Sequence, residues 1–473
     1  MSQHTREVRR GGQPSGELTV AEAIELAVGL QKGGLLDAAE EIYQRILAAI
    51  PDHADSLHLL GLSRHERGLH EEAIGLVRKA VASAPDHADA HNNLGNMLLE
   101  QNRVDEAEAE YRLVLALRPD HAGAHTNLGS VLRRKKDNAG AEAAFRRALE
   151  LDNEHAEAYH NLGSVLRDTG RSDEALTAYQ RALALRPYDG ESYRRVGATL
   201  YALGRIPEAV AIYQRWLTLE PSSALAKHML AACSGQDVPA RASDEFVRGT
   251  FDAFAASFDV VLERLHYRAP ALIGDAVAAT LGAPAAALDV LDAGAGTGLC
   301  GPLLRPYARR LTGIDLSKPM LDRAATRGGY DALEPAELTA YMREHPAAFD
   351  LVVSADTLVY FGDLAGAASA AAATLRPGGH LIFTVEHATP EPPEGFRLNP
   401  HGRYSHGEDY VRRTLTAAGL TVVSIEKAHL RVENMIPVDG LLVTARAARQ
   451  VGVGRTARER TGEVVEMVEG GCT

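Results

Sequence analysis

A glycine-rich segment beside two aspartates gives the clearest chemical signal in this sequence. Asp292 opens the segment DAGAGTG, in which Gly294, Gly296 and Gly298 come directly after a short apolar run. Glycine residues let a backbone approach a ligand where any Cβ would collide. Asp315 ends the next apolar run, LTGID, so an acidic group is expected beside the loop. These residue types predict a binding site for a small polar ligand.

The same loop admits a second interpretation, a dinucleotide site. Gly296, Gly298 and Gly301 satisfy the G-x-G-x-x-G spacing of dinucleotide enzymes. However, the loop starts earlier, at Gly294, and Leu299 stands where that fingerprint requires glycine or alanine. The spacing therefore favours a different ligand, and a nicotinamide enzyme is the alternative.

Around the loop, short apolar runs alternate with helix-like segments from residue 244 to residue 447. FDLVVSAD ends at Asp356, LRPGGHLIFTVE gives a further strand, and TVVSIEKAHL and GLLVTAR close the region as a strand pair. Such alternation predicts a doubly wound parallel sheet with its ligand at the carboxyl ends of the strands. Taken together, these features resemble the class I S-adenosylmethionine-dependent methyltransferases, whose domain is α/β and Rossmann-like.

This resemblance implies S-adenosylmethionine as the cofactor and suggests roles for individual residues. The glycine loop would pass close to the cofactor, and Asp292 would hold its methionine end. Asp315 would accept hydrogen bonds from both ribose hydroxyls. Glu337 with Leu338 is the preferred adenine contact, and Asp331 is the alternative.

On the acceptor side, Asp356 ends its strand in the loop SADTLVY and either borders the transferred methyl group or caps the next helix. This loop is not the N/D-P-P-Y motif of methyltransferases that act on adenine amino groups or glutamine amides, so those substrates are disfavoured. His406, in the segment RLNPHGRYSHGEDY, is a candidate general base, with a surface histidine as the alternative. Asp356 and His406 are the predicted catalytic residues.

Other side chains near the predicted sheet have two possible roles. Phe251, Phe254 and Phe258 resemble the lid that precedes the first strand in many small-molecule methyltransferases, although core packing would also explain them. Arg268 is a candidate for the cofactor carboxylate. The segment LRVE, with Arg431, either faces the pocket or pairs across strands.

The first half of the chain repeats every 34 residues. Related segments, of which PDHADS is the first, begin at Pro51, Pro85, Pro119, Asn153, Pro187 and Pro221. Ten residues into the units stand Gly61, Gly95, Gly129, Gly163 and Gly197, where two helices must cross closely. Each unit also places a small residue one helical turn before a large one, which predicts a packed helix face.

This pattern resembles the tetratricopeptide repeat, with six repeats over residues 17 to 220. Such repeats bury their apolar faces only by stacking, so we expect an all-α solenoid. The segment from Ser222 to Cys233 is suited to be its capping helix, which extends the predicted solenoid to residue 233.

Asparagines at Asn93, Asn127 and Asn161 recur at the same spacing on the first helices of three repeats. An amide side chain offers an acceptor and two donors, which suits holding the backbone of an extended peptide. The arrangement resembles the repeat arm of the O-linked N-acetylglucosamine transferases. The alternative is that asparagine is merely a common repeat residue here, because the ladder breaks at Leu59 and Arg195.

Composition excludes several other classes of protein. The 473 residues carry a net charge of −13, which disfavours binding to nucleic acid. The longest uncharged run, residues 276 to 288, is too short to cross a membrane. The first residues do not form a signal peptide, so we expect a cytoplasmic protein. Cys233, Cys300 and Cys472 lie too far apart to indicate a disulfide framework or a metal site.

The predicted fold class is therefore multidomain, an all-α tetratricopeptide-repeat solenoid followed by a Rossmann-like methyltransferase domain. Residues 1 to 16 and 448 to 473 are expected to be disordered, and residues 234 to 243 to be a polar linker. The predicted function is methyl transfer with a peptide or protein partner held in the repeat groove. The alternatives are a scaffold with an inactive methyltransferase domain and a small-metabolite enzyme that uses the repeats only for assembly. The acceptor and the oligomeric state are not predicted.

Overall fold

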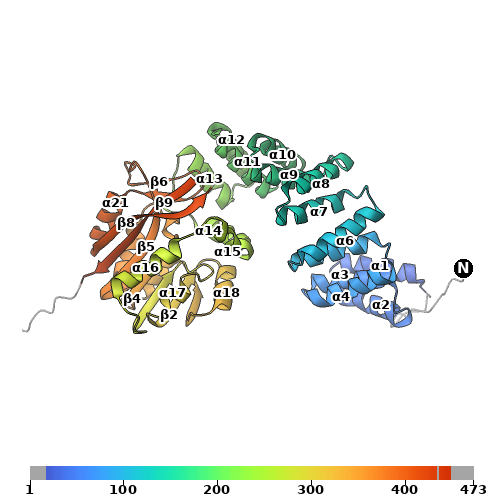
Figure 1. Ribbon diagram of the computed structural model, residues 1–473, viewed down its shortest axis with the longest axis horizontal. Helices are drawn as coiled ribbons and strands as arrows, with labels where there is room; N and C mark the ends of the chain where they lie inside the picture. Colours follow the sequence, from blue (N-terminus) through green and yellow to red (C-terminus); the bar gives the residue numbers. More distant parts are fainter. Residues whose placement is uncertain (1–17, 434–435, 449–473) are drawn as a thin grey trace, which may run out of the picture. The chain divides into compact units, whose positions relative to one another are not determined.

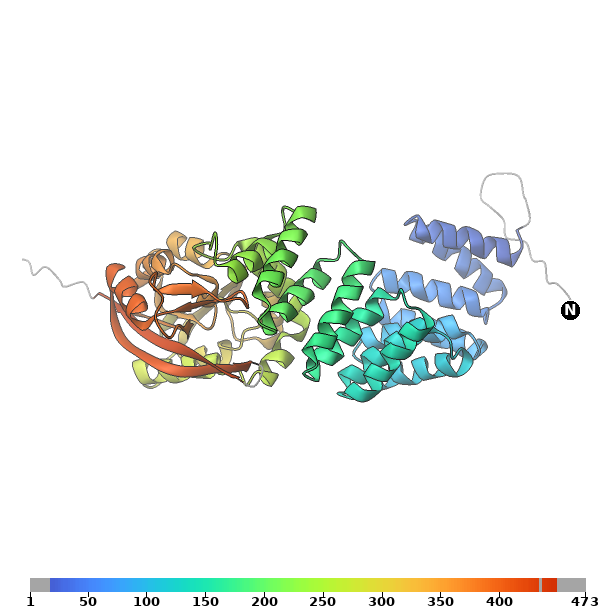
Figure 2. The same ribbon diagram turned by 90° about the horizontal axis from the view of Figure 1, so that it is seen from above.

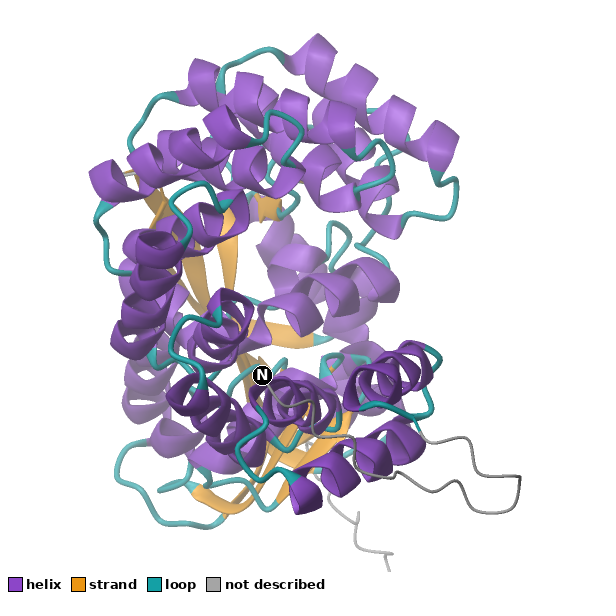
Figure 3. Ribbon diagram, turned by 90° about the vertical axis from the view of Figure 1, so that its right-hand side faces the viewer, coloured by secondary structure: helices purple, strands orange, loops and turns teal. Residues whose placement is uncertain are grey.

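The computed structural model describes residues 18 to 433 and 436 to 448, and the chain divides into two compact units, Met1–Pro221 and Ser222–Thr473 (Figure 1). The first unit is helical, and all described strands belong to the second unit (Figure 3). This confirms the predicted fold class. Apart from Ala448, the tails expected at residues 1 to 16 and 448 to 473 lie outside the described residues.

The described part of the first unit consists of six helix pairs (Figure 2). The helices are α1 (Val20–Lys32), α2 (Leu36–Ala49), α3 (Ala54–Glu66), α4 (His70–Ser83), α5 (Ala88–Glu100), α6 (Val104–Leu117), α7 (Ala122–Arg134), α8 (Asn138–Leu151), α9 (Ala156–Asp168), α10 (Ser172–Leu185), α11 (Gly190–Ala202) and α12 (Ile206–Leu219).

The first helices of successive repeats contact one another, as α3 does with α5, α5 with α7, and α7 with α9. A stack of pairs curves toward the side on which its helices lie closest together. We therefore call the exposed side of α1, α3, α5, α7, α9 and α11 the inner face of the solenoid.

The recurring glycines lie where the two helices of a pair touch. A Cβ on Gly95 would lie 2.6 Å from Cε1 of Tyr111, and one on Gly163 would lie 2.8 Å from the ring of Tyr179. Both aromatic rings are buried, so any larger residue would push the helices apart. The predicted alternation of small and large positions is confirmed.

The repeated PDH segments also have a structural role that the sequence reasoning missed. Nδ1 of His53, His87 and His121 accepts a hydrogen bond from the backbone N–H three residues later, at 3.2, 3.3 and 3.1 Å. The histidines thereby cap the first helices of three repeats, because the first N–H groups of a helix have no partner within it.

The second unit is built around one twisted sheet with strand order β3-β2-β1-β4-β5-β7-β6, and β9 pairs antiparallel with β5 and with β8. The strands are β1 (Leu288–Ala293), β2 (Ala308–Asp315), β3 (Ala332–Pro335), β4 (Phe349–Ser354), β5 (Leu375–His387), β6 (Phe396–Leu398), β7 (Tyr404–His406), β8 (Leu420–Glu433) and β9 (Ile436–Ala447). The remaining elements are α13 (Ala224–Ser234), α14 (Asp244–Phe254), η1 (Ala255–Ser257), α15 (Phe258–Arg264), α16 (Ala269–Leu281), α17 (Gly301–Leu304), α18 (Lys318–Arg327), α19 (Leu338–Glu344), η2 (Leu358–Tyr360), α20 (Ala365–Thr374) and α21 (Glu408–Ala417).

β1, β2 and β4 pair in parallel, so their carboxyl ends, which carry the predicted site residues, lie side by side. Asp292 pairs with Gly313 of β2 and with Val353 of β4. Consequently the glycine loop, Asp315 and Asp356 all follow at the same edge of the sheet. This is the edge at which doubly wound sheets bind ligands.

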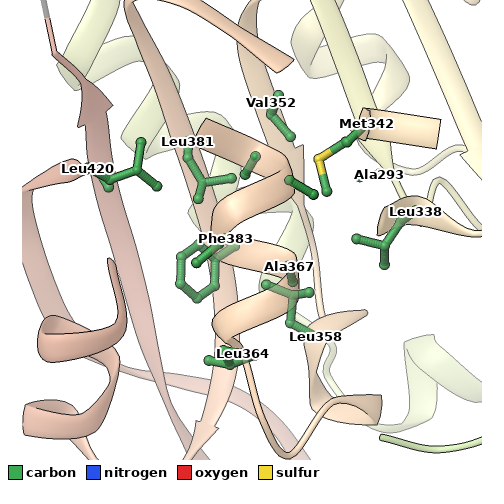
Figure 4. Close-up of a cluster of buried hydrophobic side chains, with 14 of the residues drawn as sticks. Ala293, Leu338, Met342, Val352, Leu358, Leu364, Ala367, Leu381, Phe383 and Leu420 are labelled. Atoms are coloured by element: carbon green, nitrogen blue, oxygen red, sulfur yellow. The ribbon is translucent and has the colours of Figure 1, made fainter. Parts of the chain in front are cut away.

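Alternate residues of the strands point to opposite faces of the sheet and belong to two separate hydrophobic layers. Val290 and Leu351 pack with Ile273 of α16 on one face, whereas the neighbouring strand residues face the other layer. In that second layer Phe383 lies with Leu358, Leu364 and other buried side chains (Figure 4). A two-sided apolar sheet is what a doubly wound fold requires.

The expected capping helix packs within the second unit. Nε2 of His228 in α13 lies 2.8 Å from the carbonyl oxygen of Gly402, and the His228 ring stacks on Phe246 at 4.0 Å. The structure accordingly places the boundary between the units before α13, at Pro221, instead of at residue 233.

The segment predicted as a polar linker is partly fixed to the second unit. Ala242 donates its N–H to the carbonyl of Tyr360, and the N–H of Gly362 is donated to Ala240, both at 2.8 Å. The hydroxyl of Tyr404 donates to the carbonyl of Pro239 at 2.7 Å. Residues 239 to 242 are therefore packed against the second unit and belong to its domain.

Candidate functional site

A cavity of about 280 Å³ lies at the carboxyl ends of β1, β2 and β4. The glycine loop and Asp315 form one wall, Asp356 borders another, and the aromatic side chains of α14 and α15 cover them. The structure thus brings together residues that lie far apart in the sequence of the second unit.

The three loop glycines are needed for different reasons. Gly296 has φ +53°, and a Cβ there would meet only Cε1 of Phe258, at 4.0 Å, so its backbone faces open space. A Cβ on Gly294 would lie 2.0 Å from Oγ1 of Thr357, and one on Gly298 would lie 3.0 Å from Cβ of Ala324. Only Gly296 therefore leaves room for a ligand, whereas Gly294 and Gly298 allow the loop to pack.

Asp315 lies at the end of β2 and lines the cavity. Its Oδ2 accepts the N–H of Gly296 and its Oδ1 accepts the N–H of Ser317, both at 2.9 Å. Burial raises the pKa of Asp315, and these two N–H groups oppose that shift. Each carboxylate oxygen keeps a further lone pair, so Asp315 can accept two hydroxyl groups at once.

Asp292 is buried behind the loop and does not line the cavity. The hydroxyl of Tyr330 donates to its Oδ2 at 2.6 Å, and its Oδ1 has no hydrogen-bond partner among the described residues. Burial raises the pKa of Asp292 to about 7. In this position Asp292 holds the ring of Tyr330, which packs against Gly298 and Gly301, so the geometry favours a supporting role over the expected contact with a ligand.

Of the two acids considered for the adenine contact, the structure brings Glu337 to the cavity, together with Leu338. Glu337 caps α19 and accepts the N–H of Ala340 at 2.8 Å. Burial opposes its ionisation, but hydrogen bonds from Thr339 and Ala340 hold the pKa of Glu337 below its ordinary value. Asp331 instead accepts from Arg305 at 2.7 Å, away from the cavity.

Asp356 follows β4 and adopts a left-handed backbone, with φ +56°. Its Oδ2 accepts from Nη1 of Arg431 at 2.6 Å, whereas its buried Oδ1 has no partner among the described residues. Burial raises the pKa of Asp356, and Arg431 opposes that rise. A strained backbone and an unsatisfied carboxylate oxygen at a cavity wall are features of functional sites.

Arg431 stands at the centre of a buried charge cluster. Besides Asp356 it contacts Glu433, with Nε 2.6 Å from Oε1, and it also donates to Glu386. Arg403 donates to Glu386 at 2.7 Å and contacts Glu433 as well. Burial lowers the pKa of the Arg431 guanidinium, but the three acids outweigh burial and keep it raised. Both roles predicted for the segment LRVE are therefore found in Arg431, which lines the cavity and also pairs with an acid on another strand.

Three phenylalanines of α14 and α15 line the cavity together with the glycine loop. Phe258 packs edge-to-face on Phe251 at 5.9 Å and on Phe254 at 5.5 Å, and Phe251 also contacts Tyr360 at 5.5 Å. All four rings line the cavity, so the predicted lid residues face the site.

The lid is tied to the loops beneath it by two aspartates. Oδ1 of Asp259 accepts from the hydroxyl of Thr297 in the glycine loop, and Oδ1 of Asp252 accepts from the hydroxyl of Ser317, both at 2.6 Å. Arg327 also donates to Asp259, at 2.8 Å. These bonds connect the lid residues to the glycine loop and to the start of α18.

His406 does not line the cavity, which corrects the expectation that it could act as a base there. It lies in β7, fully buried, and its Nε2 donates to the carbonyl of Phe361 at 2.8 Å. Burial lowers the pKa of His406 to about 4. Arg268 is likewise not among the lining residues, whereas its neighbour Tyr267 is.

Sequence reasoning missed three contributors to the site. Arg241, in the segment expected to be a linker, lines the cavity and lies 3.5 Å from Glu337. Tyr360 lies in a single helical turn, and Glu386 comes from the end of β5. Of these three residues, only Glu386 could have been found from the sequence. It ends an apolar strand, in VEH, and an acidic residue is seldom buried unless a basic residue pairs with it.

The asparagine ladder lies on the first helices of the solenoid and bonds between repeats. The amide of Asn93 lies 2.9 Å from Nε2 of His58, and Asn127 donates to Asn96 at 3.0 Å. Asn161 donates weakly to Ser130, at 3.4 Å. The ladder therefore has a structural function between the repeats.

Family models match both halves of the chain. A methyltransferase-domain model matches residues 264 to 425. Tetratricopeptide-repeat models match residues 24 to 88, 60 to 122, 121 to 187 and 154 to 220.

Several curated methyltransferases are similar to part of the chain. Ubiquinone biosynthesis O-methyltransferase of Bordetella bronchiseptica is 26% identical over 164 residues, which cover 32% of this chain and 66% of that protein. Malonyl-[acyl-carrier protein] O-methyltransferase of Acetivibrio thermocellus is 36% identical over 105 residues, covering 22% of this chain and 37% of that protein. Nodulation protein S of Rhizobium tropici is 33% identical over 103 residues, covering 20% and 42%. The chain thus spans less than two thirds of the length of each.

Similar solved structures cover less than half of the chain. PilF of Pseudomonas aeruginosa is 22% identical, covers 45% of this chain and 96% of its own, and gives a TM-score of 0.41. YrrB, described as a tetratricopeptide-repeat protein with an unusual peptide-binding site, is 20% identical, covers 39% and 96%, and gives a TM-score of 0.33.

Proposed function

Because this chain carries tetratricopeptide repeats followed by a methyltransferase domain, we propose that it transfers the methyl group of S-adenosylmethionine to an acceptor in the Gly296 cavity while the repeats hold a peptide or protein partner. One observation carries the proposal. A single cavity is lined by the open backbone of Gly296, by the strand-end carboxylate of Asp315 with spare lone pairs, and by Asp356, of which one buried oxygen lacks a partner among the described residues.

The residues present fit S-adenosylmethionine. Asp315 can accept the two ribose hydroxyls, and Gly296 provides space where a side chain would block a ligand. Glu337 and Leu338, just beyond β3, offer a carboxylate and an apolar surface for the adenine. Asp292 is the exception, since it is buried, does not line the cavity and accepts the hydroxyl of Tyr330 at Oδ2.

The bound cofactor would supply a methyl group already activated by positive sulfur, so the chain's task is chiefly positioning and exclusion of water. The rings of Phe251, Phe254, Phe258 and Tyr360 surround the cavity, and aromatic faces stabilise a nearby cation. The lid bonds through Asp259 keep those rings over the glycine loop.

Asp356 is the candidate for contact with the acceptor. Its free Oδ1 can accept a hydrogen bond or a proton from a nucleophilic hydroxyl or amine. Arg431 fixes the other oxygen and keeps the carboxylate in place. This geometry supports Asp356, and not His406, as the group that would receive the proton.

A small acceptor fits the cavity better than a folded protein surface, because most of the lining is aromatic or aliphatic and the lid covers it. The O-methyltransferases of ubiquinone biosynthesis to which the chain is similar support an oxygen acceptor on a small molecule. Methylation of the recruited partner is the second candidate, and the asparagine ladder supports recruitment because its carbonyl oxygens can still accept backbone N–H groups.

Ligand-induced stabilisation tests the cofactor part of this proposal. A ligand at 100 times its Kd stabilises the folded state by about 2.7 kcal/mol. Scanning calorimetry of the full chain should show that S-adenosylmethionine and its demethylated product raise the melting temperature of one transition. The single tryptophan, Trp216, reports on the repeats, so its unfolding should not shift. Stabilisation by a nicotinamide dinucleotide alone would instead support the dinucleotide alternative, and no stabilisation would support the inactive scaffold.

A further inference from the structure

The inner face of the solenoid changes the sign of its charge along its length. Its first three helices, α1, α3 and α5, carry two basic residues and six acids. These residues are Lys32, Arg64, Glu22, Glu25, Asp55, Glu66, Asp89 and Glu100. The next three, α7, α9 and α11, carry five arginines and three acids, and four of these arginines form a cluster that we call the basic inner patch. It consists of Arg133, Arg167, Arg194 and Arg195.

The basic inner patch continues the asparagine ladder. Arg195 stands 34 residues after Asn161, so it takes the ladder position in the sixth repeat, where the sequence pattern breaks. Arg133 and Arg167 are also 34 residues apart, on the last turns of α7 and α9. Nη1 of Arg133 lies 3.3 Å from Asp168 of the next repeat, which shows that these side chains share one face.

The four guanidinium groups share only two carboxylates within the patch. Nε of Arg194 and Nε of Arg195 lie 2.6 and 2.7 Å from Glu191. Arg133 and Arg167 both contact Asp168, at 3.3 and 3.2 Å. Two positive charges are therefore not balanced inside the patch. Burial, followed by the charges of Arg194 and Arg167, also lowers the pKa of Arg195, as expected for a cation among cations.

We infer that the basic inner patch binds an acidic segment of a polypeptide, with its carboxylates on Arg167 and Arg195. This inference rests on the proposed recruitment by the repeats and names the chemistry of the partner. Guanidinium groups bind carboxylates in a bidentate manner, and the neighbouring amides of Asn127 and Asn161 suit the backbone of an extended chain. The acids of α3 and α5 repel the same segment, so they fix the end of the solenoid at which it binds.

Fluorescence anisotropy with defined peptides tests this inference on the full chain. The probe is a fluorescein-labelled peptide of the sequence GSEEGEEGS, and its partner has glutamine in place of every glutamate. The acidic peptide should bind about tenfold more tightly than the neutral one at 50 mM salt, and the difference should shrink at 300 mM. Equal binding of the two peptides, or no binding of the acidic one, would overturn the inference.

A matched pair of double variants locates the site. Arg167→Gln with Arg195→Gln should weaken the acidic peptide about tenfold. Arg112→Gln with Arg147→Gln removes the same charge from α6 and α8, where both arginines are exposed and paired with neighbouring glutamates, and should have no effect. Equal weakening by both double variants would show that only the overall charge matters and would contradict the inference.

Two further measurements separate this inference from other outcomes. Arg167→Lys with Arg195→Lys keeps the charge and should retain most of the binding, while Trp216 fluorescence shows whether the repeats remain folded. Tighter binding of a single-stranded RNA of equal charge would assign the patch to nucleic acid and overturn the peptide inference. S-adenosylmethionine binding by the same variants should be unchanged, so a failed methyl transfer and a failed peptide contact are distinguishable.

Discussion

Nη1 of Arg431 lies 2.6 Å from Oδ2 of Asp356, a residue that lines the cavity, while Oδ1 of the same aspartate is buried and has no partner among the described residues. Arg431 is itself held by Glu386 and Glu433. One carboxylate oxygen is therefore held by Arg431, and the other has an unfilled capacity to accept a hydrogen bond. This division of roles would let Asp356 receive a proton from an acceptor without moving.

The Asp356→Asn variant should separate cofactor binding from transfer. The amide keeps the shape of the side chain but cannot take a proton, so methyl transfer should fall about 100-fold or more while S-adenosylmethionine binding changes little. Single-turnover transfer of a tritium-labelled methyl group measures the first quantity, and calorimetry measures the second. Equal loss of both would mean that Asp356 holds the cofactor instead.

The rate should also depend on pH through Asp356. Burial raises its pKa above the ordinary value for aspartate, and only the ionised form accepts a proton. Transfer should therefore decline as the pH falls through that raised pKa. Arg431→Lys should move the decline to higher pH, because a weaker partner leaves the pKa higher. A profile unaffected by this variant would contradict the coupling between the two residues.

Removal of the Arg431 charge should destabilise the second unit. Arg431→Leu leaves three acids around a site where Arg431 is 3% exposed, and breaking a buried ion pair costs about 3 to 5 kcal/mol. Scanning calorimetry measures the loss. Arg413→Leu is the matched control, because Arg413 pairs with Glu391 on the surface and should matter little. Equal effects of the two variants would contradict the importance of the buried cluster.

Asp292 should make stability depend on pH. Its pKa is raised to about 7 in the folded state, so between the unfolded value near 4 and about 7 the folded protein binds more protons than the unfolded chain. Stability should therefore fall as the pH rises through this window, by at most about 1.4 kcal/mol per pH unit. Asp292→Asn removes that term, so the variant should gain stability relative to the parent between pH 5 and pH 8. A constant difference would contradict the raised pKa.

Two loop glycines should respond differently to alanine. A Cβ at Gly294 would lie 2.0 Å from Oγ1 of Thr357, so Gly294→Ala should lower the melting temperature strongly. Gly296→Ala meets no close neighbour and should fold with a cost of about 1 kcal/mol from its positive φ, yet it should weaken S-adenosylmethionine at least tenfold. Binding by Gly296→Ala as tight as in the parent would place the cofactor elsewhere.

Joint replacement of Asn93, Asn127 and Asn161 by alanine tests the repeat groove. The variant should lose some solenoid stability, since each amide bonds to the adjacent repeat, and Trp216 fluorescence would record this. Peptide binding should weaken while S-adenosylmethionine binding does not. Unchanged turnover on the true acceptor would show that binding of a partner by the repeats is not needed for catalysis.

Much of the fold could be predicted from the sequence, because its signals were periodic. The 34-residue spacing predicted the repeats. Asp315 and Asp356 each stand at the end of a predicted strand, and the carboxyl ends of parallel strands lie at the same edge of a sheet, so their proximity could also be predicted. The three-residue strands β6 and β7 gave no such period, so the sequence did not predict that His406 lies in a strand. Its pairing with β5 is what turns His406 away from the cavity.

Side-chain direction was the part that sequence could not supply. Asp292 and Asp315 both end apolar runs, yet Tyr330 holds the first behind the loop and two backbone N–H groups present the second to the cavity. The choice between Glu337 and Asp331 likewise depended on Arg305, a residue distant from both in the sequence pattern. Contacts of this kind are set by packing between segments, and no local signal encodes them.

The central claim is that Asp315 and Gly296 hold S-adenosylmethionine, and calorimetric titration of the full chain tests it most directly. The account predicts one binding event, weakened at least about tenfold in Asp315→Asn and unchanged in Asp322→Asn, an exposed aspartate of α18 paired with Lys318. No binding to the parent chain, or equal affinity in the parent and Asp315→Asn, would contradict it.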